Sequence, residues 1–378
     1  MHAILSLVFS VLWLLSAVGA HPLEKRQCQA TLNTAVSVAQ RLQSHYFRTS
    51  NGQYDGGSLW TDANTLEDLH NLMLATGTDE FAAVADQSFI GRSAQDSGTD
   101  HWKSILGGSN DDAGWIVLAL WKIADYKMAR GLSATAYLNS ALTIYDIIAG
   151  EWDDNTCGGG VWWSTAHTYK NGQPITNELF LLVSATGAIN FPNQAPFLAN
   201  ANKVWNWLKN SGMRNSDGLW NDGLTDSCAN NGQTTWTYNQ GVIASGLSAL
   251  YAVTKDATLL TEAEITLDAT IKLLTSNNIL KESCDSAPGP TECNQDQQIF
   301  KVRSVQYYLD RANDPARNAK YSSFLGSQSS GVFHFGTNAA NDVGSVWYAP
   351  DAVRSLFTPK TSASGLEAHI SAAKYGRA

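Results

Sequence analysis

Two adjacent carboxylates, Asp111 and Asp112, are the residues whose type and spacing most directly suggest chemistry. They follow a Gly-Gly-Ser-Asn turn and precede the apolar segment 116–121. A helix that is apolar on nearly every face belongs in a protein interior, so we expect its first turn to open into a cleft at one end of the core. The spacing Ser109-x-x-Asp112 also fits a capping box, and acidic residues suit a helix N-terminus. The pair alone therefore does not establish catalysis.

Paired carboxyl groups are the usual machinery for cleaving a glycosidic bond. Consecutive helix residues point about 100° apart around the axis. Their carboxyl groups can therefore lie about 5–5.5 Å apart, the separation found in retaining glycosidases, rather than the wider one of inverting enzymes. Mutual repulsion would raise the pKa of one group, giving a protonated acid beside an ionised nucleophile. The residues themselves do not say which aspartate takes which role.

Aromatic and amide side chains recur in the long loops before the apolar helices. The chain has 13 Trp and 13 Tyr, many of them in these loops. A pyranose offers apolar C–H faces to aromatic rings and hydroxyls to amides and carboxylates, so this composition is typical of a sugar-binding cleft. We expect the following residues to contact substrate: Trp60, Asn64, Trp115, Trp163, Asn177, Asp222, Trp236, Tyr238 and Asp296. Three other tryptophans, in mid-helix, are expected to pack in the core: Trp121, Trp205 and Trp207.

Helical periodicity runs through almost the whole chain and defines about six pairs of helices. The expected helices cover residues 29–47, 60–75, 79–95, a segment starting at 111, 133–152, 176–186, 196–211, 237–253, 258–276, 296–312, 315–328 and 342–357. Each pair has an amphipathic member, a long polar loop and an apolar member. Such pairs predict an all-α fold, an (α/α)6 barrel with amphipathic helices outside and apolar ones inside. An open solenoid is the alternative.

The two ends of the chain differ from the rest. Residues 1–20 are typical of a secretory signal peptide, and Lys25-Arg26 resembles a dibasic processing site that ends a leader, 21–26. The catalytic domain is expected over 27–359, followed by a polar tail over 360–378 that lacks the hydrophobic segment of a lipid-anchor signal. These features predict a secreted protein without a membrane anchor.

The amino-acid composition excludes several classes of binding partner and cofactor. Of the 378 residues, 44% are hydrophobic and 16% charged, as in a soluble enzyme, and the net charge of −9 argues against nucleic acid and anionic membranes. The eight histidines show no metal-ligand spacing, so no metal or cofactor is expected. Cys284 should pair with Cys293 across a turn-rich loop, and Cys157 with Cys228, which leaves Cys28 over. We expect a monomer.

Several motifs, in this order, resemble glycoside hydrolase family 76. They are Asn110-Asp111-Asp112-x-x-Trp115, Cys157-Gly-Gly-Gly-x-Trp-Trp163, Tyr169-Lys170-Asn171 with Thr176-Asn177-Glu178, Trp236-Thr-Tyr-Asn239-Gln-Gly241 and Asn294-Gln-Asp-Gln297. The resemblance spans about residues 29–357. It implies an (α/α)6 barrel and retaining hydrolysis of α-1,6-mannosidic bonds without a metal. It also implies that Asp111 is the nucleophile and Asp112 the general acid/base.

The family also contains fungal cell-wall members that act on the mannose core of lipid-anchored glycoproteins. Those members usually carry an anchor signal and a motif closer to Gly-Gly-Leu-Arg-Trp, where this chain has Val161-Trp162-Trp163. The difference favours a secreted endo-α-1,6-mannanase acting on α-1,6-mannan. The signal peptide together with the dibasic site suggests a fungal source. A transglycosylase that uses the same residues is the second hypothesis, and a mannan-binding protein without catalysis is the third.

Overall fold

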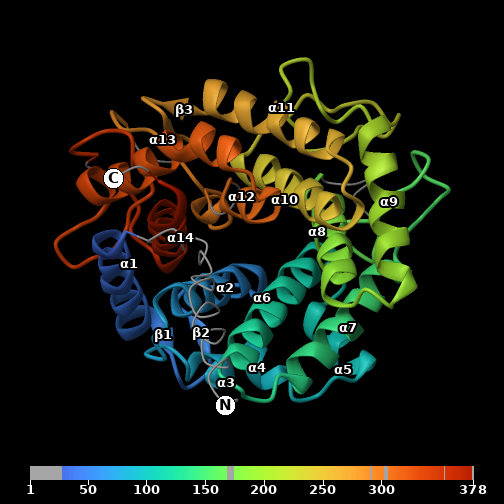
Figure 1. Ribbon diagram of the computed structural model, residues 1–378, viewed down its shortest axis with the longest axis horizontal. Coiled ribbons are helices and arrows are strands. Elements are labelled where there is room, and N and C mark those ends of the chain that lie inside the picture. The colour runs from blue at the N-terminus through green and yellow to red at the C-terminus, as the bar shows by residue number, and fades with distance from the viewer. Residues whose placement is uncertain (1–27, 168–173, 290–291, 302–304, 353, 377–378) are drawn as a thin grey trace, which may run out of the picture.

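The computed structural model describes residues 28–167, 174–289, 292–301, 305–352 and 354–376. The expected signal peptide and leader lie outside the described residues, and so does the Tyr169-Lys170-Asn171 motif. Figure 1 looks down the short axis of the molecule and shows helices arranged in two concentric layers around a centre.

Six helices form the inner layer, and each packs against the next around the ring. They are α2 (Leu59–Thr76), α6 (Asn110–Ala129), α8 (Pro174–Asn190), α10 (Thr237–Thr254), α12 (Val305–Ala312) and α14 (Pro359–Tyr375). Because α14 packs on both α12 and α2, the ring is closed. The predicted (α/α)6 barrel is therefore confirmed, and the open solenoid is wrong.

Six further helices cover the inner ring. They are α1 (Gln29–Arg41), α5 (Thr99–Leu106), α7 (Thr135–Gly150), α9 (Ala195–Asn210), α11 (Thr258–Leu273) and α13 (Pro315–Gly331). Their burial is one-sided: α7 buries Tyr137, Ala141, Ile144 and Ile148, spaced by three or four residues, whereas α6 buries nearly every residue after Asp112 up to Trp121. The amphipathic-outside, apolar-inside rule that predicted the barrel is thus observed.

Short elements connect the layers. Outer helices α1 and α13 each end in a π-helical turn, η1 (Leu42–Tyr46) and η3 (Val332–Gly336). Two antiparallel hairpins follow outer helices: β1 (Phe47–Arg48) with β2 (Gln53–Tyr54), and β3 (Thr275–Ser276) with β4 (Ile279–Leu280). A 3-10 turn, η2 (Gln297–Ile299), lies ahead of α12.

Three predictions about the elements are wrong. The helix expected over 79–95 is two short helices, α3 (Val84–Gln87) and α4 (Phe89–Ser93), because extended Ser88 ends the first and caps the second through a hydrogen bond from Gly91 N at 3.0 Å. In place of the helix expected over 342–357, the described residues 342–352 and 354–357 are irregular, with isolated bridges. The predicted tail from residue 360 is instead α14, the helix that closes the barrel.

The polar composition of α14 has a physical reason. The helix buries Thr361, Ser362, Ser364, Glu367 and Ser371 because the axis of the ring is itself polar. Asn71 and Glu367, for example, meet across α2 and α14 at 3.5 Å. Ser371 likewise donates to Gln306 Oε1 at 2.9 Å, so polar residues in this position have partners across the ring and do not indicate a surface segment.

The opposite, C-terminal end of the inner helices holds a cavity of about 430 Å³, lined by charged groups that include Lys122, Asp125 and Arg311. Lys122 is paired with Asp125 at 3.4 Å. Cations at this end suit the negative ends of the inner-helix dipoles, and the Asp111–Asp112 pair lies at the other end.

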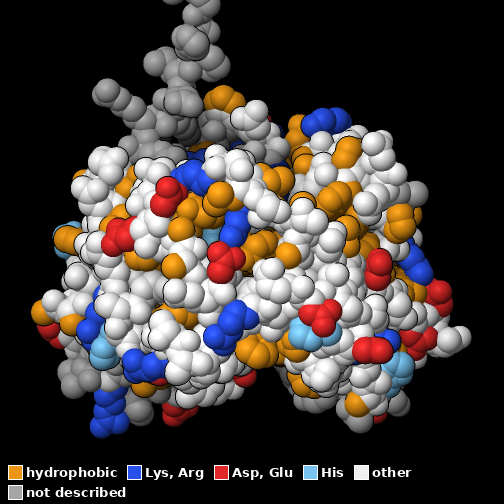
Figure 2. All heavy atoms as spheres, turned by 90° about the horizontal axis from the view of Figure 1, so that it is seen from below, with side chains coloured by type: hydrophobic (Ala, Val, Ile, Leu, Met, Phe, Trp, Pro, Cys, Tyr) orange, Lys and Arg blue, Asp and Glu red, His pale blue; other side chains and the backbone are white. Residues whose placement is uncertain are grey.

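Both predicted disulfides are present. Cys284–Cys293 closes a short loop, and Cys157–Cys228 ties the loop before α8 to the loop before α10. Cys28 is free, as expected. On the side face seen in Figure 2, basic and acidic side chains are interspersed among polar and apolar ones. Within the described residues no helix combines the length and hydropathy needed to cross a bilayer.

Candidate active site

The Asp111–Asp112 pair occupies the first turn of α6, held by the loop that precedes α8. Asn110 donates from its backbone N to Trp163 O at 2.9 Å and from Nδ2 to Trp162 O at 2.8 Å. Gly108 makes this contact possible: with φ of 86°, a Cβ there would lie 2.4 Å from Thr165 Oγ1. The same loop delivers the Trp163 side chain to hydrogen-bond Asp111.

Ser109 does not form the predicted capping box. It is the N-cap residue of α6, yet its side chain makes no cap hydrogen bond. Its hydroxyl instead donates to Asp111 Oδ1 at 2.7 Å and also lowers the pKa of Asp112. One hydroxyl therefore serves both carboxyl groups, which places the two groups close together.

The environment drives the pKa values of both carboxyl groups upward. Burial raises the pKa of Asp111, and the hydrogen bonds from Ser109 and Trp163 partly offset the rise. Burial, then the charges of Asp111 and Asp296, raise the pKa of Asp112 to about 7. Asp111 thus has the donors that stabilise a carboxylate, while Asp112 has the like-charged neighbours that favour a protonated acid.

Aromatic rings from two other repeats cluster with Trp115, which lies one turn after the pair on α6. Trp60 lies 5.9 Å from Trp115 and 6.2 Å from Phe300 by ring centroids. Its Nε1 donates to Asp296 Oδ1 at 3.1 Å, which joins α2 to the segment before α12. Trp60 is half-buried, whereas Trp115 is only 4% exposed and forms the inner wall of this cluster.

A second group of predicted residues lies on and before α10. Trp236 and Asn239 both hydrogen-bond Asp222, whose pKa burial raises to about 6. Tyr238 stacks on Phe300 with centroids 4.0 Å apart and an interplanar angle of 2°. Burial, then the charges of Asp222 and Asp111, raise the pKa of Tyr238, so this group lies close to Asp111.

Two predicted contact residues lie behind the surface of the site. Asn177 is fully buried and bonds the backbone of Val161 twice, accepting from its N at 2.8 Å and donating to its O at 3.1 Å. Asn64 is 2% exposed and donates to Trp60 O at 2.8 Å. We therefore assign both amides to holding the loop and the tryptophan that face the pair.

The structure adds three ionisable groups that the sequence reasoning did not select. Glu178 is fully buried, and burial followed by the charge of Asp222 raises its pKa well above the usual range. Burial raises the pKa of Asp62 to about 7. Lys360, near the start of α14, lies close to Asp62 and Asp296, whose charges raise its pKa against the larger lowering by burial. Glu178 stands beside the selected Asn177, so its place in that motif was an available signal.

Five inner helices, namely α2, α6, α8, α10 and α14, and the segment before α12 therefore contribute groups to one acidic cluster at the N-terminal end of the ring. A helical barrel that brings paired carboxyl groups with split environments among tryptophan and tyrosine rings is the arrangement of a glycoside hydrolase. Comparison with known sequences identifies the family. The sequence model described as glycosyl hydrolase family 76 matches residues 30–373, and the chain belongs to that family.

Curated relatives are fungal. A putative mannan endo-1,6-α-mannosidase of Schizosaccharomyces pombe is 27% identical over 285 residues, covering 72% of this chain and 62% of the relative. The mannan endo-1,6-α-mannosidase DFG5 of Candida albicans is 27% identical over 203 residues, covering 51% of this chain and 44% of the relative. The chain thus matches less than two thirds of the length of either protein.

Solved structures share the fold. An inactive variant of the α-1,6-mannanase GH76A of Salegentibacter, with two consecutive aspartates changed to asparagine and α-1,6-mannotriose bound, has a TM-score of 0.73 at 18% identity, covering 91% of this chain and 99% of that one. Dfg5 of Chaetomium thermophilum, in complex with glucosamine, has a TM-score of 0.77 at 16% identity, covering 93% and 92%.

Proposed function

We propose that the protein is a retaining endo-α-1,6-mannosidase that cleaves unbranched or lightly branched α-1,6-mannan. The observation that carries the proposal is the Asp111–Asp112 pair, which shares the Ser109 hydroxyl. Trp163 hydrogen-bonds Asp111, and Trp60 donates to Asp296, whose charge acts on Asp112. The mannotriose bound to the bacterial mannanase, whose inactivating changes fall on two consecutive aspartates, supports the substrate class.

The residues divide the reaction into two displacements. The Asp111 carboxylate attacks C1 of the mannosyl residue while Asp112 donates its proton to O6 of the departing sugar, so the C1–O6 bond breaks as an ester forms. The Asp112 carboxylate then takes a proton from water, and the hydroxide displaces Asp111 from C1 with a second inversion. Each catalytic group returns to its starting protonation state, and the product keeps the α-configuration.

The first test is incubation with linear α-1,6-mannan, with product size and anomeric configuration followed by NMR. Short α-configured oligosaccharides that appear first are the expected result, and β-configured products would contradict retention. Added α-1,6-mannobiose separates hydrolysis from transfer, because a transglycosylase passes the ester to the sugar and forms longer products. Binding without cleavage would favour the non-catalytic alternative.

The pH dependence follows from the two carboxyl groups. Asp112 must be protonated to act as the acid, so kcat/KM should fall as pH rises through about 7, the pKa of that group. Asp111 must be ionised, so kcat/KM should also fall on the acid side. Asp296→Asn removes a charge that raises the pKa of Asp112 and should move the alkaline limb to lower pH. An alkaline limb that stays in place in this variant would contradict the assignment.

We further propose that the protein is a secreted monomer. The two disulfides support an oxidising compartment, since such bonds persist outside the cytosol. Size-exclusion chromatography with light scattering on protein from culture medium tests both statements.

A further inference from the structure

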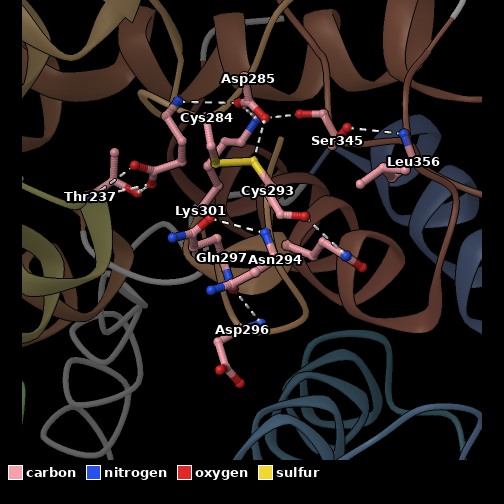
Figure 3. The surroundings of a disulfide bond; sticks show 12 residues. Thr237, Cys284, Asp285, Cys293, Asn294, Asp296, Gln297, Lys301, Ser345 and Leu356 are labelled. Carbon is pink, nitrogen blue, oxygen red and sulfur yellow. Dashed lines mark hydrogen bonds and ion pairs between the residues drawn. A yellow bond between two sulfur atoms is a disulfide. The ribbon is translucent and has the colours of Figure 1, made fainter. Parts of the chain in front are cut away.

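The segment 293–301, which carries Asp296 and Phe300, is fixed at both ends to two adjacent residues. At its start, Cys293 forms the disulfide with Cys284. At its end, Lys301 Nζ lies 2.5 Å from Asp285 Oδ2, and both side chains are almost fully buried, at 4% and 1% exposure. Figure 3 shows the disulfide and the Asp285–Lys301 pair together at the base of this segment. Two neighbouring anchors therefore convert nine residues into a closed loop.

The anchor is tied to the rest of the site. Asp285 Oδ2 accepts from Glu282 N at 3.1 Å, and Glu282 accepts from Thr237 N at 3.2 Å at the start of α10. Lys301 Nζ also donates to the carbonyl of Ser345, in the loop that leads to α14. The buried pair thus connects the start of α10, the loop that leads to α14 and the segment 293–301.

The opposite side of the loop faces the catalytic pair. Asn294 Oδ1 accepts from the backbone N of Asp296 at 2.9 Å and fixes a turn there. In Figure 3 the Asp296 side chain points away from the disulfide, and its carboxylate bonds Trp60 and raises the pKa of Asp112. Phe300, directly before Lys301, stacks on Tyr238.

We propose that Lys301 and Asp285, together with the Cys284–Cys293 disulfide, are positioning residues for substrate binding: they hold Asp296 and Phe300 at the wall of the glycan site. A buried ion pair is weak evidence for added stability, because desolvation offsets its attraction, but it fixes geometry when every group is bonded. This inference rests on the proposed function, since the wall matters only if a glycan binds there.

Lys301→Met tests the inference, with Arg317→Met as the matched control. Arg317 of α13 pairs with Glu264 of α11 at 2.6 Å, and Figure 1 shows both outer helices across the ring from α6. For Lys301→Met we expect KM for linear α-1,6-mannotetraose to rise by about tenfold or more, equivalent to about 1.4 kcal/mol of binding. We expect kcat to change far less. The alkaline limb should move to lower pH, because Asp296 moves away from Asp112 and its charge no longer raises the pKa of that group. The control should lose stability and keep its KM and pH profile.

The double variant Cys284→Ala/Cys293→Ala removes the disulfide and keeps the Asp285–Lys301 ion pair. It therefore tests the positioning role even if Lys301→Met does not fold. It should raise KM and shift the alkaline limb in the same direction. A folded variant of either kind with wild-type KM and pH profile overturns the positioning role. A wild-type protein that neither cleaves nor binds mannotetraose instead refutes the proposed function itself.

Discussion

Asp111→Asn is expected to reduce kcat/KM on linear α-1,6-mannan by about three orders of magnitude or more, because an amide cannot form the glycosyl ester. The fold should survive and its melting temperature should stay equal or rise, since the change removes a carboxyl group whose ionisation burial disfavours. Asp217→Asn, at an exposed loop position, is the matched control and should retain activity. Wild-type rates in Asp111→Asn would refute the assignment.

Asp112→Asn should lose as much activity on mannan but differ on an activated substrate. α-1,6-Mannobiosyl fluoride has a leaving group that needs no proton, so Asp112→Asn should form the ester and then stall, because no base activates water. Azide needs no base and should release an α-configured mannosyl azide from this variant. In Asp111→Asn, azide can only attack in place of the missing carboxylate, which gives the β-configured product. Reversed products would exchange the two roles.

The sequence predicted the ring of helix pairs because inner and outer helices differ in burial pattern. Inner helices such as α6 lack a polar face, and outer helices such as α7 carry a clear stripe. The prediction failed where helices owe their position to polar contacts. The break at Ser88 depends on a side-chain cap, and the polar residues of α14 resemble a surface segment until their partners across the ring are known.

The catalytic candidates were predictable because their types and order are local features of the chain. The division of labour among the others was not, because it depends on contacts between distant segments. Nothing in the sequence places the amide of Asn177 on Val161 or Asp296 against Trp60. Phe300 and Lys360 were missed for the same reason: each acquires its surroundings only when the ring closes.

Deletion of residues 359–378 is expected to abolish the cooperative fold. Within this stretch α14 packs on α1, α2, α12 and α13, and its Leu366, Ile370 and Ala373 are buried. Without it the ring loses one of its six inner helices, and the apolar faces of four other helices become exposed. That loss exceeds the roughly 5–15 kcal/mol by which a native domain is stable. Circular dichroism and thermal unfolding measure the outcome.

Two point variants in α14 compare the contribution of its buried apolar packing with that of a surface ion pair. Leu366→Ala creates a cavity in a fully buried position and should lower the free energy of unfolding by about 2–5 kcal/mol. Lys374→Ala breaks only a partly exposed pair with Asp310 and should cost less than about 1 kcal/mol. If the truncated chain unfolds cooperatively at the wild-type temperature, residues 360–378 are a dispensable tail after all. The ring would then be stable without its sixth inner helix.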